Sequence, residues 1–182
     1  MRAVNVARTV AAGVAVLGLV TGCSELGLGG SEPGTPAVAG PGKDDLLDPC
    51  TGVADEWLIE TGLDPATERD VVNPTDVSSW RICAWQPFDG SPYRIDVLSS
   101  SLTIDDVRSN ETQDFVREIA VGSRQGLIHK PKNANLRTCY VTLPAEQGMF
   151  EVSVGWRDAD VPDDFCEVAV KHAIDLEPHL PR

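Results

Sequence analysis

Few side chains in this 182-residue sequence have the types and the spacing that chemistry would require. Two carboxylates could hydrolyse a glycosidic bond if one protonated the leaving oxygen while the other attacked the sugar or activated a water molecule. Glu118 together with Asp158 or Asp160 could form such a pair if loops brought them together. The sequence contains neither a Gly-x-Ser-x-Gly motif nor a His-Glu-x-x-His motif. We therefore assign no catalytic residue.

Metal ligands are not predicted either. Residues 158–164, DADVPDD, alternate carboxylates as calcium loops do, but they lack the glycine and the downstream glutamate of such loops. Acids directly before a helix more often cap it and interact with its dipole. His172 falls on the apolar face of a predicted helix, where a partly buried histidine is more common than a metal ligand. We expect no metal and no cofactor.

Cys23 follows an apolar run, residues 10–20, that is about half as long as a helix that crosses a membrane. Arg2 and Arg8 precede this run and no acidic residue does, which is typical of a signal peptide. The ending VTGC resembles the bacterial lipobox, which implies cleavage after residue 22 and a diacylglycerol, with acyl chains such as palmitate, on the Cys23 thiol. We therefore expect a lipoprotein anchored on the extracytoplasmic face of the cell membrane.

The chain after the signal peptide, residues 1–22, divides into a tether and one domain. Residues 23–43 are rich in glycine and proline without apolar periodicity, which predicts a flexible tether. Residues 44–182 are numerous enough for a single extracytoplasmic domain with its own core. The formal net charge of −13 argues against a nucleic-acid partner, because phosphates attract lysine and arginine. Contact with the membrane is expected through the lipid anchor.

Local patterns in the domain predict an α+β fold. A helix is expected to begin at Asp48-Pro49 and to end at Gly62, and a second to span residues 162–176. Period-two alternation predicts two hairpins, and a short helix and two less regular strands are expected between them. The hairpins are 80–85 with 93–97 and 138–143 with 149–156. The short helix is 103–109, and the less regular strands are 115–121 and 124–129. The order predicts an antiparallel sheet with the N- and C-terminal helices packed on one face.

Four cysteines of this exported domain are expected to form two disulfide bonds. Cys50, Cys83, Cys139 and Cys166 allow three pairings. We favour Cys50 with Cys83 and Cys139 with Cys166, because each bond would then join a terminal helix to a neighbouring strand. In the chain-entropy model, each loop of this size corresponds to a stabilisation of about 3 to 4 kcal/mol.

Several short motifs together resemble a known family. They are Asp48-Pro49-Cys50 opening a helix, Cys83-Ala84-Trp85, Cys139-Tyr140-Val141 before a hairpin, Cys166 in the last helix, and Leu180-Pro181. This set is similar to the actinobacterial cell-envelope lipoproteins of unknown function that include the LprB and LprC group. The resemblance implies a cell-envelope location and a two-disulfide α+β domain. It carries over no catalytic residues.

Two classes of function fit these observations. The first is a non-catalytic binding or accessory module of the cell envelope, with an envelope lipid, glycan or protein as ligand. The alternative is an envelope glycan-modifying hydrolase that uses the loop carboxylates. We place the binding surface in the irregular middle, residues 99–135, where basic side chains gather in an otherwise acidic protein. The candidate binding rim is Arg124, His129, Lys130 and Lys132, although these charges could instead balance nearby acids.

Overall fold

The structure of the protein is a computed structural model that describes residues 46–71, 79–133, 135–158, 160–162 and 164–182. These residues belong to one compact unit, Val38–Arg182. The predicted signal peptide, the lipid-bearing Cys23 and the tether lie outside the described residues. No helix among the described residues is both long enough and apolar enough to cross a membrane.

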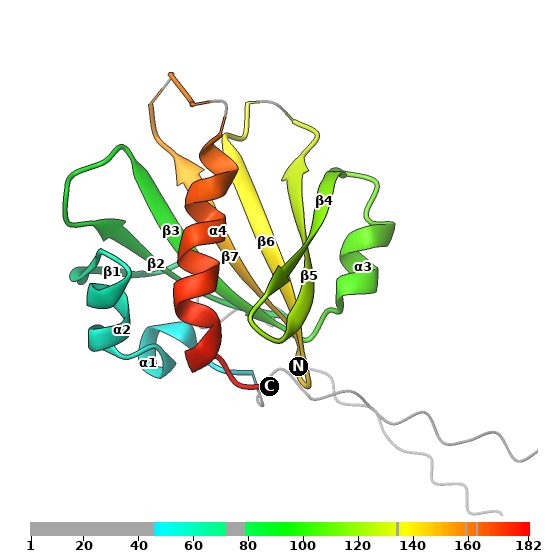
Figure 1. Ribbon diagram of the computed structural model, residues 1–182, viewed down its shortest axis with the longest axis horizontal. Helices are drawn as coiled ribbons and strands as arrows, with labels where there is room; N and C mark the ends of the chain where they lie inside the picture. The colour runs from blue at the N-terminus through cyan, green and yellow to red at the C-terminus, as the bar shows by residue number, and fades with distance from the viewer. Residues whose placement is uncertain (1–45, 72–78, 134, 159, 163) are drawn as a thin grey trace, which may run out of the picture. The chain divides into compact units, whose positions relative to one another are not determined.

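The described residues form a seven-stranded sheet with the order β1-β2-β3-β7-β6-β5-β4 (Figure 1). Every neighbouring pair of strands is antiparallel. The strands are β1 (Leu63–Asp70), β2 (Trp80–Pro87), β3 (Tyr93–Ser100), β4 (Gln113–Val121), β5 (Arg124–Pro131), β6 (Thr138–Ala145) and β7 (Gly148–Trp156). The antiparallel sheet is therefore confirmed, and most of the regular structure is strand.

The two faces of the sheet differ because successive side chains of a strand point in opposite directions. One face presents the apolar side chains of the central strands to the core, among them Trp85, Val97, Val152 and Val141, all fully buried. The opposite face carries the polar positions of the same strands. These are Asp96, Tyr140, Thr142, Glu151 and Ser153.

The C-terminal helix α4 (Phe165–Leu176) lies across the apolar face of the sheet (Figure 1). Ala169, Ala173 and Leu176 are spaced three or four residues apart, so they point to one side of the helix and are buried in the core. The short 3-10 helix η2 (Glu177–His179) follows directly. The predicted C-terminal helix is confirmed, although it begins at Phe165, after Pro162.

The N-terminal helix predicted as continuous is divided into α1 (Pro49–Gly52) and α2 (Asp55–Glu60). Val53 and Ala54 are extended, with ψ of 115° and 146°, and this interrupts the helical hydrogen bonding. The predicted cap is present, because the Asp48 carboxylate accepts a hydrogen bond of 3.0 Å from the Cys50 N–H. Leu58 of α2 is fully buried in the same apolar cluster as α4.

Two pairs of cysteines lie at disulfide distance, in the favoured pairing. The sulfur atoms of Cys50 and Cys83 are 2.02 Å apart and join α1 to β2. Those of Cys139 and Cys166 are 1.98 Å apart and join β6 to α4. Each pair therefore attaches a helical segment to a strand of the sheet.

Candidate functional site

A cleft of about 280 Å³ lies on the face of the sheet that points away from α4, beneath helix α3 (Ile104–Ser109). Its apolar walls come from four elements and the segment before α3. They are Trp80, Ile82, Leu98, Leu102, Val107 and Met149. None of the described side chains of α3 is buried, so this helix covers the cleft without filling it.

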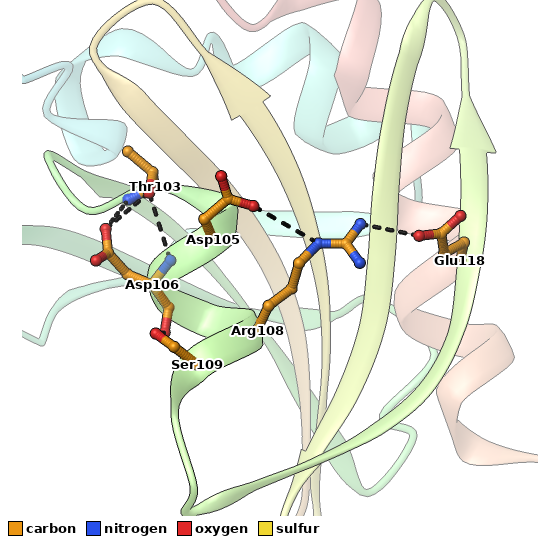
Figure 2. A network of polar contacts seen from close by, with 6 residues as sticks. All are labelled: Thr103, Asp105, Asp106, Arg108, Ser109 and Glu118. Carbon is orange, nitrogen blue, oxygen red and sulfur yellow. Dashed lines mark hydrogen bonds and ion pairs between the residues drawn. The ribbon is translucent and has the colours of Figure 1, made fainter.

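Polar contacts hold α3 in place over the sheet. The N–H and the hydroxyl of Thr103 donate hydrogen bonds of 2.7 and 2.8 Å to the Asp106 carboxylate, which forms a capping box. The same bonds hold the pKa of Asp106 below its ordinary value. Figure 2 shows Arg108 between two carboxylates, that of Asp105 in α3 and that of Glu118 in β4, at 3.9 and 2.9 Å. The helix is thereby tied to the edge strand of the sheet.

A buried polar cluster lies in the cleft, where β5, β6 and β7 are neighbours. His129, Thr142 and Glu151 are 4%, 0% and 3% exposed, so water does not solvate them. The Thr142 hydroxyl donates a hydrogen bond of 2.6 Å to Glu151 Oε1, and His129 Nε2 lies 3.0 Å from the same oxygen. His129 Nδ1 lies 3.1 Å from Oε1 of Gln113. Both ring nitrogens therefore lie within hydrogen-bond distance of side-chain oxygens, which fixes the orientation of the ring.

Strand register brings this cluster together. Thr142 pairs with Glu151 across β6 and β7, and His129 pairs with Tyr140 across β5 and β6, so all four side chains share one face. The Tyr140 ring stacks on the His129 ring with centroids 4.9 Å apart. Burial raises the pKa of Tyr140 to about 12, so its phenol stays protonated and can donate a hydrogen bond. The cleft thus combines apolar walls with a few positioned polar groups, as small-molecule sites do.

The structure does not gather the candidate rim on one surface. Of its four residues, His129 alone lines the cleft. Arg124 points to the α4 face, and Lys130 and Lys132 line a separate cavity together with Phe165. Arg124 is only 5% exposed and bonds to the C-terminal segment, which makes it part of the core rather than a rim. The Lys130 ammonium lies 4.7 Å from the centre of the Phe165 ring. Ligand binding by these residues stays a prediction.

The loop carboxylates predicted for a hydrolase do not line the cleft. Glu118 is ion-paired with Arg108, and the described lining of the cleft contains none of the three acids. The segment with Asp158 and Asp160 follows β7. Its backbone carbonyls accept hydrogen bonds from Arg137 and from the Trp156 indole. Residues 159 and 163 of the DADVPDD segment lie outside the described residues.

Candidate metal ligands are few in the part of the chain that the structure describes. One group has ligand atoms close enough to share an ion, and it consists of Cys50, Glu68 and Cys83. The two sulfur atoms of this group are bonded to each other, so neither is a thiolate that could bind a metal.

Sequence reasoning named His129 but missed its partners in the cleft. Thr142 and Glu151 occupy strand positions that alternate with apolar residues. On a sheet with one covered face, such polar positions are expected to be exposed to solvent. The signal that could have identified them is their register. A carboxylate in the middle of a central strand, opposite a threonine and near a histidine of the next strand, is positioned for a hydrogen-bonded cluster.

Comparisons with known proteins identify a family for this chain. Residues 18–179 match the family model described as "Protein of unknown function (DUF3558)". Searches of the curated proteins and of the solved structures find no match. Because the matched region covers most of the 182 residues, the chain belongs to the DUF3558 family of proteins of unknown function.

Proposed function

We propose that this protein is a lipid-anchored, extracytoplasmic binding module of the cell envelope, of the LprB and LprC type, and that it binds an apolar or amphipathic envelope molecule in the cleft beneath α3. The observation that carries the proposal is the cleft of about 280 Å³, in which apolar walls surround the buried His129–Glu151 pair. The apolar run before Cys23 supports the anchor, and the two cysteine pairs support an oxidising location.

The contacts in the cleft favour binding over catalysis. Glu151 Oε1 already faces the Thr142 hydroxyl and His129 Nε2, at 2.6 and 3.0 Å. A carboxylate held in this way is suited to fix the orientation of a ligand, because its position does not change when the ligand arrives. The hydrolase alternative is less well supported, since Glu118 is neutralised by Arg108 outside the cleft.

Replacement of Cys23 with alanine in a bacterial host is expected to release the protein from its lipid anchor. In the wild type, we expect the mature chain in the membrane fraction and a mass increase from the diacylglycerol. The variant should lose this mass increase and should accumulate as the uncut precursor. If the variant is processed as before and stays in the membrane fraction to the same extent, the anchor is not at Cys23.

Filling the cleft is expected to weaken ligand binding without unfolding the protein. The probe is N-phenyl-1-naphthylamine, a neutral apolar dye that fluoresces when it leaves water. The host is the whole chain with Cys23→Ser, refolded with its disulfide bonds. Val107→Trp places a large side chain into the cleft from α3, a helix without a buried side chain, so we expect about tenfold weaker binding of the dye.

Ile104→Trp is the matched control, because Ile104 belongs to the same helix but is outside the described lining of the cleft. We expect this variant to bind the dye within about twofold of the parent chain. Circular dichroism should show the same fold for both variants. Equal dye affinity in the two variants would place the binding site elsewhere.

A further inference from the structure

A second cavity, of about 110 Å³, lies beside the cleft and is surrounded by three arginines. They are Arg69 of β1, Arg94 of β3 and Arg157, which follows β7. We call this cavity the arginine pocket. Its other walls include Ala84 and Gln86 of β2.

The charges around the arginine pocket are not balanced. Arg94 donates from Nε to the Asp96 carboxylate at 2.8 Å, and Asp96 is 7% exposed. Among the residues that the structure describes, neither Arg69 nor Arg157 forms an ion pair. Three guanidinium groups therefore share one carboxylate, in a protein whose formal net charge is −13.

Three arginines elsewhere in the described structure are paired with carboxylates. Arg108, Arg117 and Arg124 each have a glutamate partner, at 2.9, 2.9 and 3.0 Å. Arg157 instead donates to neutral groups, the Gln86 side-chain oxygen at 2.9 Å and the Ser91 carbonyl at 3.1 Å. These two bonds hold its guanidinium at the pocket without neutralising it. A planar guanidinium held in this way suits an oxyanion, which it can bind through two parallel hydrogen bonds.

The arginine pocket and the cleft are neighbours on one face of the sheet. Ile82 lines the cleft and Ala84 lines the arginine pocket, and they are successive same-face positions of β2, about 7 Å apart. Tyr140, which lines the cleft, interacts electrostatically with Glu151 there and with Asp96 and Arg94 at the arginine pocket. One ligand can therefore reach both.

We propose that the arginine pocket binds the phosphate group of an amphiphile whose apolar part lies in the cleft, an inference that rests on the binding function proposed above. Three guanidinium charges against one carboxylate leave two positive charges, which match a phosphate monoester that is nearly dianionic at neutral pH. The apolar walls of the neighbouring cleft take a hydrocarbon chain. Phosphate and chain together define the ligand class.

The test compares octyl phosphate with octanol, which has the same chain without the phosphate. Both are titrated by calorimetry into the whole chain with Cys23→Ser. We expect octyl phosphate to bind at least about tenfold more tightly than octanol, with an affinity that falls as salt is added. In Arg69→Gln/Arg157→Gln, this preference should fall to about twofold or less, while octanol binds as before. Arg94 is left in place because it pairs with the buried Asp96.

Arg117→Gln/Lys171→Gln is the charge-matched control. It removes two positive charges on the α4 side of the sheet, where both side chains are exposed, and it should keep the preference for octyl phosphate. Equal affinities of the parent chain for octyl phosphate and octanol would overturn the proposal. The same holds if the control variant loses the preference as strongly as the arginine-pocket variant.

Inorganic phosphate separates the two sources of the anion. If it binds much more weakly than octyl phosphate, the amphiphile is supported. If it binds equally tightly, the pocket takes free phosphate and the amphiphile proposal is wrong. If the proposed binding function of the cleft is wrong, neither octanol nor the neutral dye will bind. If only the arginine-pocket proposal is wrong, octanol and the dye will still bind.

Discussion

Replacement of Arg124 with methionine is expected to lower the free energy of unfolding by about 3 to 5 kcal/mol, because it leaves a buried carboxylate without its partner. Arg124 and Glu177 have only 5% and 8% of their side-chain surface exposed, and Arg124 Nε lies 3.0 Å from Glu177 Oε1. The same guanidinium donates to the backbone carbonyls of Leu180, Pro181 and Pro144, at 2.7, 2.8 and 3.1 Å. The Glu177 carboxylate and the Leu180 carbonyl, which are buried, would be left without a partner.

The pair matters because it fastens the C-terminal segment to the β4–β5 hairpin. Gly122 in the turn has a φ of +55°, and a Cβ atom there would collide with the Glu177 carboxylate. The absence of a side chain at this position therefore makes room for Glu177. Loss of Arg124 should loosen η2 and the residues after it before it affects the centre of the sheet.

Arg117→Met is the control for this prediction. Arg117 of β4 also pairs with a glutamate, Glu167 of α4, but both side chains are largely exposed, and we expect a loss below about 1 kcal/mol. Urea denaturation measures the difference. The double variant Arg124→Met/Glu177→Leu should recover part of the loss, because no buried charge then remains. Similar losses for Arg124→Met and Arg117→Met would contradict the assignment of a buried ion pair.

Lowering the pH from 6.5 to about 4 is expected to remove about 3 kcal/mol of stability through His172 alone. His172 is 2% exposed in α4, and burial lowers its pKa from 6.5 to about 4, assisted by the charge of Lys171 and opposed by that of Asp175. Between these two values the unfolded chain binds the proton and the folded protein does not. The free energy of unfolding therefore falls as the pH falls through this range.

The hydrogen bonds of His172 are consistent with a neutral ring. The Thr61 hydroxyl donates to the Asp175 carboxylate at 2.7 Å, so it accepts from His172 Nδ1, also at 2.7 Å. Nε2 then carries no proton and can accept from the Tyr93 hydroxyl, 3.4 Å away. Protonation of Nε2 would turn the Tyr93 hydroxyl from donor to acceptor and, above all, would bring a charge into the buried site.

His172→Asn is the variant that isolates this effect, because its amide can still donate to Thr61. Urea denaturation between pH 7 and pH 4 should give the variant a smaller loss of stability than the wild type, by about 3 kcal/mol over the range. The variant is expected to be less stable than the wild type at pH 7, so the slope rather than the absolute value is compared. Identical slopes would show that His172 does not stay neutral in the folded protein.

The sequence predicted most strands of the sheet, but it did not predict β1. Residues 63–70, LDPATERD, contain a proline and no period-two alternation of apolar residues. This strand lies at the edge of the sheet and most of it is exposed, so burial imposes no pattern on it. Its register with β2 also shifts between Asp64 and Arg69. Only pairing with β2 identifies it as a strand, and it carries one arginine of the arginine pocket.

The sequence by itself determined the elements whose patterns are local: the alternating strands, the C-terminal helix, predicted over residues 162–176, and the even set of cysteines. Tertiary structure alone decided which polar side chains meet. His129 and Glu151 are 22 residues apart, and the pairing of β5, β6 and β7 brings them within 3.0 Å. The physical reason is that alternation tells which face a side chain occupies, whereas strand order and register, set by packing of the whole core, decide its neighbours on that face.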